Sequence, residues 1–276
     1  RHRLGGFARN TPEGMEMELE GSPRDLESFV GDLRSEAPSL AMIHSLDRQV
    51  VNVPEKPHHR GFEIRESRSD GRRLALIPPD VCVCGECLAE LFTPGNRRYL
   101  YPFINCTDCG PRFTIIRSLP YDRRATTMAH FTMCRKCLAE YRDPLDRRFH
   151  AQPDACPVCG PALTLVDGGG RPIPGDPIMG AVMLLKRGMI VAVKGLGGFH
   201  LAVDATDERA VRRLRLRKHR EEKPFALMTG SVAAARGLVA MTAAEARLLT
   251  GRERPIVLAK RKHDSVAADE TAPGNS

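Results

Sequence analysis

The sequence contains no tryptophan, and aromatic residues make up only 5% of its 276 residues. Stacking of nucleic-acid bases on aromatic side chains is therefore not expected to be its main task. The sequence also lacks a run of about 20 consecutive apolar residues, the length that a membrane-spanning helix requires. The first residues, Arg1 to Gly6, lack the apolar core of a secretory signal peptide. We therefore expect a soluble, folded protein located in the cytoplasm.

The hydrophobic content of 42% is enough to form buried cores, and the length favours two or three compact units. Nine cysteines are present, and eight of them form four CxxC pairs. In a secreted protein these would suggest disulfides. An odd number of cysteines and the absence of an export signal instead favour metal binding in a reducing compartment.

The four CxxC pairs belong to an internal duplication. They are separated by 18, 24 and 18 residues, so each cysteine of the first two pairs recurs fifty residues later. Other positions share this offset, for example Arg97-Arg98 with Arg147-Arg148. The duplication predicts one four-thiolate zinc site per copy, although ligands could also be exchanged between the copies. The eight predicted ligands are Cys84, Cys87, Cys106, Cys109, Cys134, Cys137, Cys156 and Cys159.

Four sulfur ligands leave no coordination position for water, so we expect both zinc ions to be structural. They would replace the hydrophobic core that a unit of about fifty residues cannot supply. Redox-active CxxC pairs are the alternative, but four of them in a repeat argue against it. Cys82 lies outside the repeat and is expected to be a spare thiol. His150 could replace a cysteine ligand or could be a surface histidine.

The first segment, residues 1–52, is expected to be a small α+β unit. Alternating residues predict a strand at 15–20, and Ser22 and Pro23 predict the start of a helix. A further strand at 40–45 would complete part of a ferredoxin-like sandwich. The motif from Gly6 to Gly14 resembles the second half of an acylphosphatase domain.

That resemblance implies that Asn10 orients the water that attacks an acyl phosphate. The family's phosphate-binding loop is expected before Arg1, so the domain is expected to be N-terminally incomplete. Without the resemblance, Asn10 would be read as an asparagine that favours a turn.

The last segment, residues 177–276, alternates helical and strand patterns as an α/β domain does. A helix is predicted from Pro177 to Gly188, a buried strand at 190–193, and a glycine-rich turn after it. Thr206 is expected to cap the next helix, and a strand is expected at 225–228.

A dense basic run extends from Arg209 to Lys223 and is expected to attract anions, although it could equally be a solvated helix face. Three of its cations, Lys218, Arg220 and Lys223, lie close together in the sequence. Their mutual repulsion must be offset by an anion or by the two intervening glutamates, so a triphosphate is a sensible ligand.

The stretch from Lys194 to Thr206, together with Lys218, Arg220, Lys223 and Pro224, is similar to YrdC domains. These domains bind ATP and make carbamoyl-adenylate-type intermediates. The resemblance implies that Lys218, Arg220 and Lys223 hold phosphates of ATP, with Mg²⁺, or the acyl phosphate. It also implies that Lys194, Phe199 and His200 line the pocket. The rest of such a domain is expected beyond residue 276.

Taken together, a partial acylphosphatase sandwich, a duplicated zinc-finger module and a partial YrdC-like α/β domain resemble the HypF family, the carbamoyltransferases of [NiFe] hydrogenase maturation. The resemblance implies that carbamoyl phosphate is cleaved to carbamate, which ATP converts to carbamoyl-adenylate. The carbamoyl group would then pass to the C-terminal cysteine of a HypE-like acceptor protein, as a precursor of cyanide ligands. The expected organisation is an acylphosphatase-like domain at 1–52, a linker at 53–79, the zinc-finger module at 80–163, a linker at 164–176 and the YrdC-like domain at 177–276.

Two other functions fit parts of the sequence. A zinc ribbon joined to a basic YrdC-like domain could bind RNA, at least weakly. A tRNA threonylcarbamoyl-adenylate synthase would share the YrdC-like part, but such an enzyme does not need a duplicated cysteine module.

Overall fold

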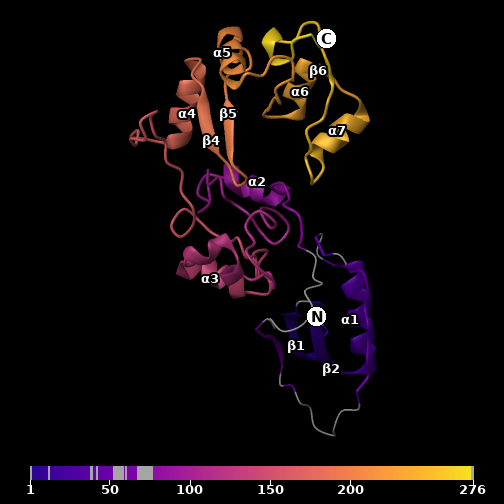
Figure 1. Ribbon diagram of the computed structural model, residues 1–276. Coiled ribbons are helices and arrows are strands. Elements are labelled where there is room, and N and C mark those ends of the chain that lie inside the picture. Colours follow the sequence, from indigo (N-terminus) through magenta and orange to yellow (C-terminus); the bar gives the residue numbers. More distant parts are fainter. Residues whose placement is uncertain are drawn as a thin grey trace. The chain divides into compact units, whose positions relative to one another are not determined.

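The computed structural model describes residues 2–11, 13–37, 40–41, 43–51, 59, 61–66 and 77–274. The chain divides into two compact units, Arg1–Pro161 and Ala162–Ser276 (Figure 1). None of the helices within the described ranges has both the length and the apolar character that a membrane-spanning segment needs.

The first unit begins with a small sheet in the strand order β2-β1-β3. Strands β1 (Gly5–Thr11) and β2 (Gly14–Glu20) form an antiparallel hairpin, and β1 also pairs in parallel with β3 (Phe62–Ile64). Gly6 is required here, because its φ is 137° and an added Cβ would lie 1.9 Å from the carbonyl oxygen of Glu18. The strand predicted at 15–20 is confirmed, since it corresponds to β2.

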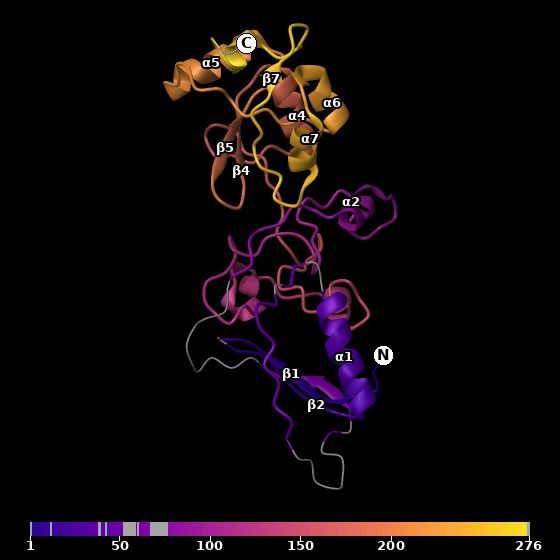
Figure 2. The ribbon, with the colours of Figure 1, turned by 90° about the vertical axis from the view of Figure 1, so that its right-hand side faces the viewer.

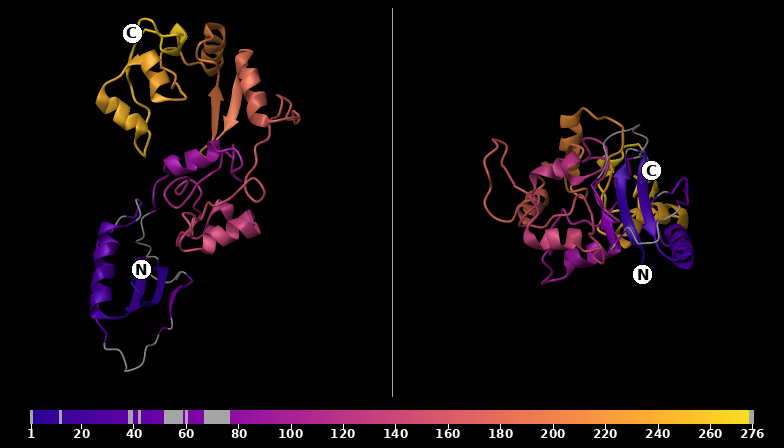
Figure 3. Two further views of the ribbon diagram at one scale, coloured as in Figure 1. Left: turned by 180° about the vertical axis from the view of Figure 1, so that it is seen from behind. Right: turned by 90° about the horizontal axis from the view of Figure 1, so that it is seen from below.

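Helix α1 (Pro23–Ser35) runs alongside β1 and β2 (Figure 3). It starts as the sequence predicts, because the Ser22 hydroxyl accepts a hydrogen bond from the Asp25 backbone N–H at 3.1 Å. The strand expected at 40–45 is wrong, since the described residues of that stretch are not in a strand. The third strand is β3, which lies within the segment expected to be a linker. Its pairing with β1 is long-range, and local alternation does not reveal such pairing.

The duplicated cysteine segment forms two copies of one backbone pattern. Helices α2 (Gly85–Phe92) and α3 (Arg135–Arg142) occupy equivalent positions, and each follows the first cysteine of its copy directly. Leu100 and His150, again fifty residues apart, have nearly the same left-handed φ of 54° and 51°. The duplication seen in the sequence is thus also present in the backbone. Two short 3-10 helices, η1 (Arg123–Ala125) and η2 (Thr127–His130), lie between the copies in the sequence.

The second unit starts with helix α4 (Pro177–Lys186) and an antiparallel pair of strands, β4 (Val191–Lys194) and β5 (Phe199–Ala202), which lie side by side in Figure 2. Helix α5 (Glu208–Lys218) follows and buries Val211 and Leu214, as its sequence predicts. The remaining elements are α6 (Val232–Leu238), β6 (Val239–Ala240), α7 (Ala243–Thr250), β7 (Lys260–Arg261) and η3 (Asp269–Thr271), and β6 pairs with β7.

Three local predictions in this unit are wrong. The strand expected to be buried at 190–193 is present as β4, but only Val191 of it is buried. The cap of α5 is Asp207, whose carboxylate accepts hydrogen bonds from two backbone N–H groups of the first turn, while the Thr206 hydroxyl donates to Asp204. Both residues are good caps, so the sequence alone could not choose between neighbours. Residues 225–228 are not a strand; Phe225 instead donates its backbone N–H to the carbonyl of Thr271 at 2.8 Å.

Candidate functional site

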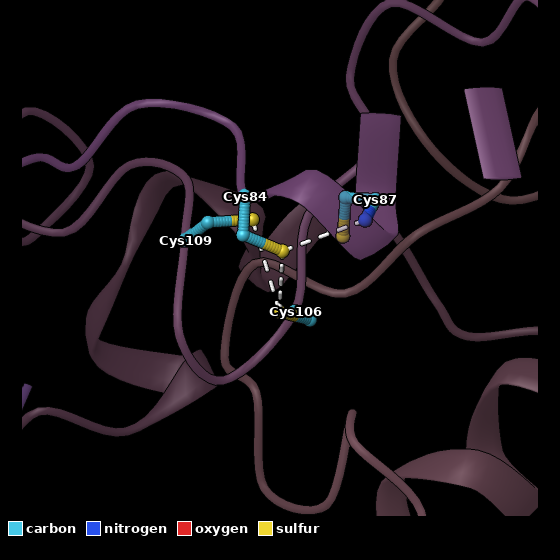
Figure 4. Close-up of side chains that lie close together, drawn as sticks. All are labelled: Cys84, Cys87, Cys106 and Cys109. Atoms are coloured by element: carbon cyan, nitrogen blue, oxygen red, sulfur yellow. Dashed lines mark hydrogen bonds between the residues drawn. The ribbon is translucent and has the colours of Figure 1, made fainter. Parts of the chain in front are cut away.

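Four thiol groups of the first copy converge on one point (Figure 4). Cys84 caps α2 and Cys87 lies in its first turn, while Cys106 and Cys109 close a tight turn from the other side. The Sγ atom of Cys106 lies 3.8 Å from that of Cys84 and 3.8 Å from that of Cys109. All four sulfur atoms lie within 4.8 Å of one another.

The second copy repeats this arrangement with Cys134, Cys137, Cys156 and Cys159. The Sγ atom of Cys156 lies 3.8 Å from that of Cys134 and 3.7 Å from that of Cys159, which in turn is 3.5 Å from that of Cys137. Each group draws its four thiols from a single copy, so ligands are not exchanged between the copies.

These separations fit a metal and exclude disulfides. Sulfur atoms placed about 2.3 Å from one ion, at the corners of a tetrahedron, lie about 3.8 Å apart. A disulfide would bring two sulfur atoms to about 2.05 Å, and all nine cysteines are free of such bonds. The chemistry of the donor set, four thiols with no oxygen or nitrogen ligand among them, suits zinc.

Hydrogen bonds favour the thiolate form of one cysteine in each group. A hydrogen bond from the Cys137 backbone lowers the pKa of the Cys134 thiol to about 6. Interactions with the Cys109 and Cys87 side chains lower the pKa of Cys106, whereas the pKa values of Cys87 and Cys109, which interact with the Cys106 side chain, and of Cys137, which is buried, are raised. Thiolates are the form that binds metal.

The two remaining candidates of this module lie outside both groups of four. His150 packs against the rings of Tyr141 and Phe149, and burial lowers the pKa of its imidazole. Cys82 precedes the first group and belongs to neither.

A network of ion pairs lies between the copies. Arg98 is only 1% exposed, and its guanidinium donates to Asp154 at 2.8 Å, to Glu140 at 2.6 Å and to the backbone carbonyl of Ala155 at 2.8 Å. Burial alone would raise the pKa of Glu140, but hydrogen bonds from Arg98 and Arg97 lower it to about 2. For Asp154 burial prevails and raises its pKa to about 6, despite the attraction of Arg98. The sequence marks the donors of this network by its repeated Arg-Arg pairs but does not predict their partners.

Asn10 lies near the end of β1, where it pairs with Met15 of β2. It lines an open pocket of about 560 Å³ within the first unit. Its charged lining consists of four arginines and two acidic residues, so positive charge predominates; they are Arg9, Arg65, Arg123, Arg124, Glu66 and Asp122. A pocket of this size and charge suits a small anionic ligand.

The glycine-rich turn of the second unit connects β4 to β5. Lys194 pairs with Phe199 across the two strands, and its Nζ atom lies 5.7 Å from the ring centroid. His200 is the next residue of β5, and the Gly195 backbone N–H donates to the Gly198 carbonyl at 2.8 Å to close the turn. All three candidate residues, Lys194, Phe199 and His200, are exposed.

The segment from Lys218 to Lys223, here called the cationic loop, begins where α5 ends. Lys218 is the last residue of the helix, and His219 ends it in a left-handed conformation with a φ of 48°. The Arg220 side chain donates to the backbone carbonyls of Lys223 and Pro224 at 3.0 and 2.7 Å. Lys218 and Lys223 are exposed, so their ammonium groups are accessible to an anion.

A buried arginine that the sequence analysis did not single out holds this loop. Arg215 is 6% exposed and donates to the backbone carbonyls of Arg220, Glu221 and Lys223 at 2.7, 3.1 and 3.2 Å. It also donates to the carbonyls of Glu270 and Thr271. Arg215 lies within a basic run. Only its helical position beside the buried Leu214 distinguishes Arg215, in the sequence, from the exposed basic residues around it.

Comparison with family models divides the chain into three regions. The HypF finger model matches residues 83–116 and 133–166, and therefore covers both cysteine groups. The acylphosphatase model matches residues 1–64, and a model described as telomere recombination, which covers Sua5, YciO and YrdC proteins, matches residues 183–276.

Curated relatives match nearly the whole chain. Carbamoyltransferase HypF2 of Cupriavidus necator is 52% identical over 94% of this chain, and carbamoyltransferase HypF of a Synechocystis species is 48% identical over 99% of it. The chain belongs to the HypF family. It spans about a third of the length of these HypF relatives, 32% and 35% respectively.

Part of a solved HypF structure has the same fold as this chain. The crystal structure described as full-length HypF in the phosphate- and nucleotide-bound form matches with a TM-score of 0.90 and 44% sequence identity. The match covers 99% of this chain and 35% of that one. The predicted fold class and family are confirmed.

Proposed function

We propose that this chain is part of an ATP-dependent carbamoyltransferase of [NiFe] hydrogenase maturation. One observation carries the proposal: a single HypF-family chain combines three features. They are an acylphosphatase-type asparagine in a basic pocket, two four-thiol groups and an exposed cationic loop. The solved relative, whose description records bound phosphate and nucleotide, supports the same combination of ligands.

In this proposal each four-thiol group holds one Zn²⁺ ion, and both ions are structural. With four sulfur ligands the ion has no open position for water or substrate. The module of residues 80–163 would then act as a scaffold between the two domains that carry out chemistry.

The first chemical step is hydrolysis of carbamoyl phosphate to carbamate and phosphate. The Asn10 amide orients the attacking water, and the basic side chains of its pocket attract the dianionic substrate. In the second step a carbamate oxygen attacks the α-phosphorus of ATP, which forms carbamoyl-adenylate and releases pyrophosphate. Lys218, Arg220 and Lys223 bind the phosphates together with Mg²⁺, and Lys194, Phe199 and His200 line the site.

The carbamoyl group then passes to a cysteine thiolate at the C-terminus of a HypE-like acceptor, and AMP leaves. A cationic loop can also bind RNA phosphates, but few aromatic residues are available for base stacking. Binding that weakens steeply with salt would favour RNA, whereas saturable ATP binding with little salt dependence favours the carbamoyltransferase.

The decisive experiment is ATP-pyrophosphate exchange that depends on carbamoyl phosphate, measured on the full-length protein that carries this chain. We expect Lys218→Ala to lower the exchange rate by about 10² to 10³, because a fixed positive charge on the transferred phosphates is lost. Arg217→Ala is the matched control, since Arg217 is an exposed neighbour on the same helix. Unchanged exchange in Lys218→Ala would remove the cationic loop from the ATP site.

Asn10 can be tested separately from ATP chemistry. We expect Asn10→Ala to lower carbamoyl phosphate hydrolysis by about 10² or more, because the water is no longer oriented. Glu13→Gln, in the exposed turn after β1, serves as the control. Exchange supplied with carbamate from ammonium and bicarbonate should be unaffected by Asn10→Ala. A loss with both carbamate sources would contradict a role confined to hydrolysis.

A further inference from the structure

The arginine pairs of the duplicated module contact the thiols of the opposite copy. Arg147, in the second copy, donates from Nη2 to the Sγ atom of Cys87 in the first copy at 2.6 Å. Arg97, in the first copy, donates from Nη2 to Cys137 Sγ in the second copy at 3.0 Å. The adjacent arginines make longer contacts to the same two sulfur atoms, with Arg98 3.6 Å from Cys137 and Arg148 4.0 Å from Cys87.

A glutamate on each cysteine-bearing helix accepts hydrogen bonds from the arginines of the other copy and so fixes their position. Glu90, one helical turn after Cys87, accepts hydrogen bonds from Arg147 at 3.0 Å and from Arg148 at 2.6 Å. In the same way Glu140, one turn after Cys137, accepts from the first copy's arginines at 2.5 and 2.6 Å. The contacts are therefore reciprocal and follow the repeat.

The cysteines that receive these contacts are fully buried. Cys87 and Cys137 are 0% exposed, whereas Cys84 and Cys134 are partly exposed. Four thiolates around one Zn²⁺ ion carry a net charge of −2, and that charge is costly in a buried site unless cations or N–H donors compensate it. Each site thus receives its compensating guanidinium groups from the other copy.

The arginines also depend on their own copy for their position. Arg97 and Arg98 lie between the two CxxC pairs of the first copy, and Arg147 and Arg148 lie between those of the second. Metal binding fixes the two pairs of a copy against each other, and with them the chain segment that carries its arginines. A metal ion in one copy therefore prepares the charge environment of the other.

We infer that the two metal sites are thermodynamically coupled, so that each zinc ion binds more tightly when the opposite site is filled. This inference rests on the zinc binding proposed above. Coupling of this kind is reciprocal, and its usual range is about 5- to 150-fold in affinity.

The coupling factor can be measured by chelator competition on the whole 276-residue chain. Cys137→Ser leaves only the first site and Cys87→Ser leaves only the second, so each gives the affinity of one site alone. The coupling factor is the overall association constant for binding two zinc ions to the wild-type chain, divided by the product of the two single-site association constants. We expect a factor above about 5. Two bound zinc ions with a factor near 1 would overturn the coupling alone, whereas a wild-type chain that binds no zinc would overturn the metal sites as well.

A second measurement does not require the serine variants to fold. Under chelator, thiols are alkylated as each site opens, and mass spectrometry assigns the modified cysteines to a copy. We expect Arg147→Met to speed alkylation of the first copy at least fivefold more than that of the second, and Arg97→Met to do the reverse. Arg142→Met, an exposed arginine of α3, should change neither rate. Faster alkylation confined to the copy that carries the substitution would overturn the inference.

Discussion

Removing zinc with a strong chelator is expected to unfold the segment that carries both cysteine groups, and readding zinc should refold it. Three members of the buried cluster of this segment are themselves ligands, with Cys87, Cys106 and Cys109 packed beside Tyr101, Ile104, Ile115, Met128 and Ala155. Its two α-helices have only 8 residues each, too few to be stable alone in water. A structural zinc site of this type contributes about 10–16 kcal/mol, which equals or exceeds the net stability of a typical domain.

Hydrogen exchange followed by mass spectrometry can locate this loss. Backbone amides of α2 and α3 should lose their protection in the metal-free chain, while those of α5 in the second unit should keep theirs. Helix α5 is a suitable internal control because it buries Val211 and Leu214 and contains no cysteine. Protection of α2 and α3 that survives complete metal removal would show that the module has a sufficient core of its own.

The cysteine groups were predictable because their geometry is encoded locally and twice. A CxxC pair brings two thiols together within a single turn, and the fifty-residue offset separates the eight thiols into two sets of four. The cap at Ser22 was predictable for the same reason, since a cap interacts with backbone only two or three residues away.

Features that depend on distant segments could not be predicted. The parallel partner of β1 is β3, which lies more than fifty residues further along the chain and is only 3 residues long. The stretch at 225–228 has the composition of a strand, yet Phe225 contacts Thr271 instead. In both cases tertiary contacts decide the structure, and a local pattern carries no information about them.

The repeat also left open how the two copies would interact. It shows that Arg98 and Arg148 are equivalent, but an arginine could contact the carboxylate of its own copy or that of the other. The structure has the crossed arrangement, in which Arg98 reaches Glu140 at 2.6 Å and Asp154 at 2.8 Å. Such a choice depends on the packing of one copy against the other.

Replacing this arginine should therefore have the largest effect of any single substitution outside the metal ligands. We expect Arg98→Ala to lower the free energy of unfolding of the zinc-loaded module by about 3–5 kcal/mol, the usual cost of breaking a buried ion pair, because Asp154 then keeps only its longer contact to Arg148 at 3.6 Å. Asp154 is 0% exposed, and one of its carboxylate oxygens already lacks a hydrogen-bond partner among the described residues. The measurement is urea unfolding followed through the hydrogen exchange of α3.

Two further variants identify the cause of that loss. Arg142→Ala removes an exposed arginine from α3 and should change the stability by no more than about 0.5 kcal/mol. Adding Asp154→Asn to Arg98→Ala removes the uncompensated charge and should recover part of the lost stability, because the two side chains share one ion pair. If the double variant is as unstable as the sum of the two single variants, the stability comes from the packing of the Arg98 side chain and not from its charge.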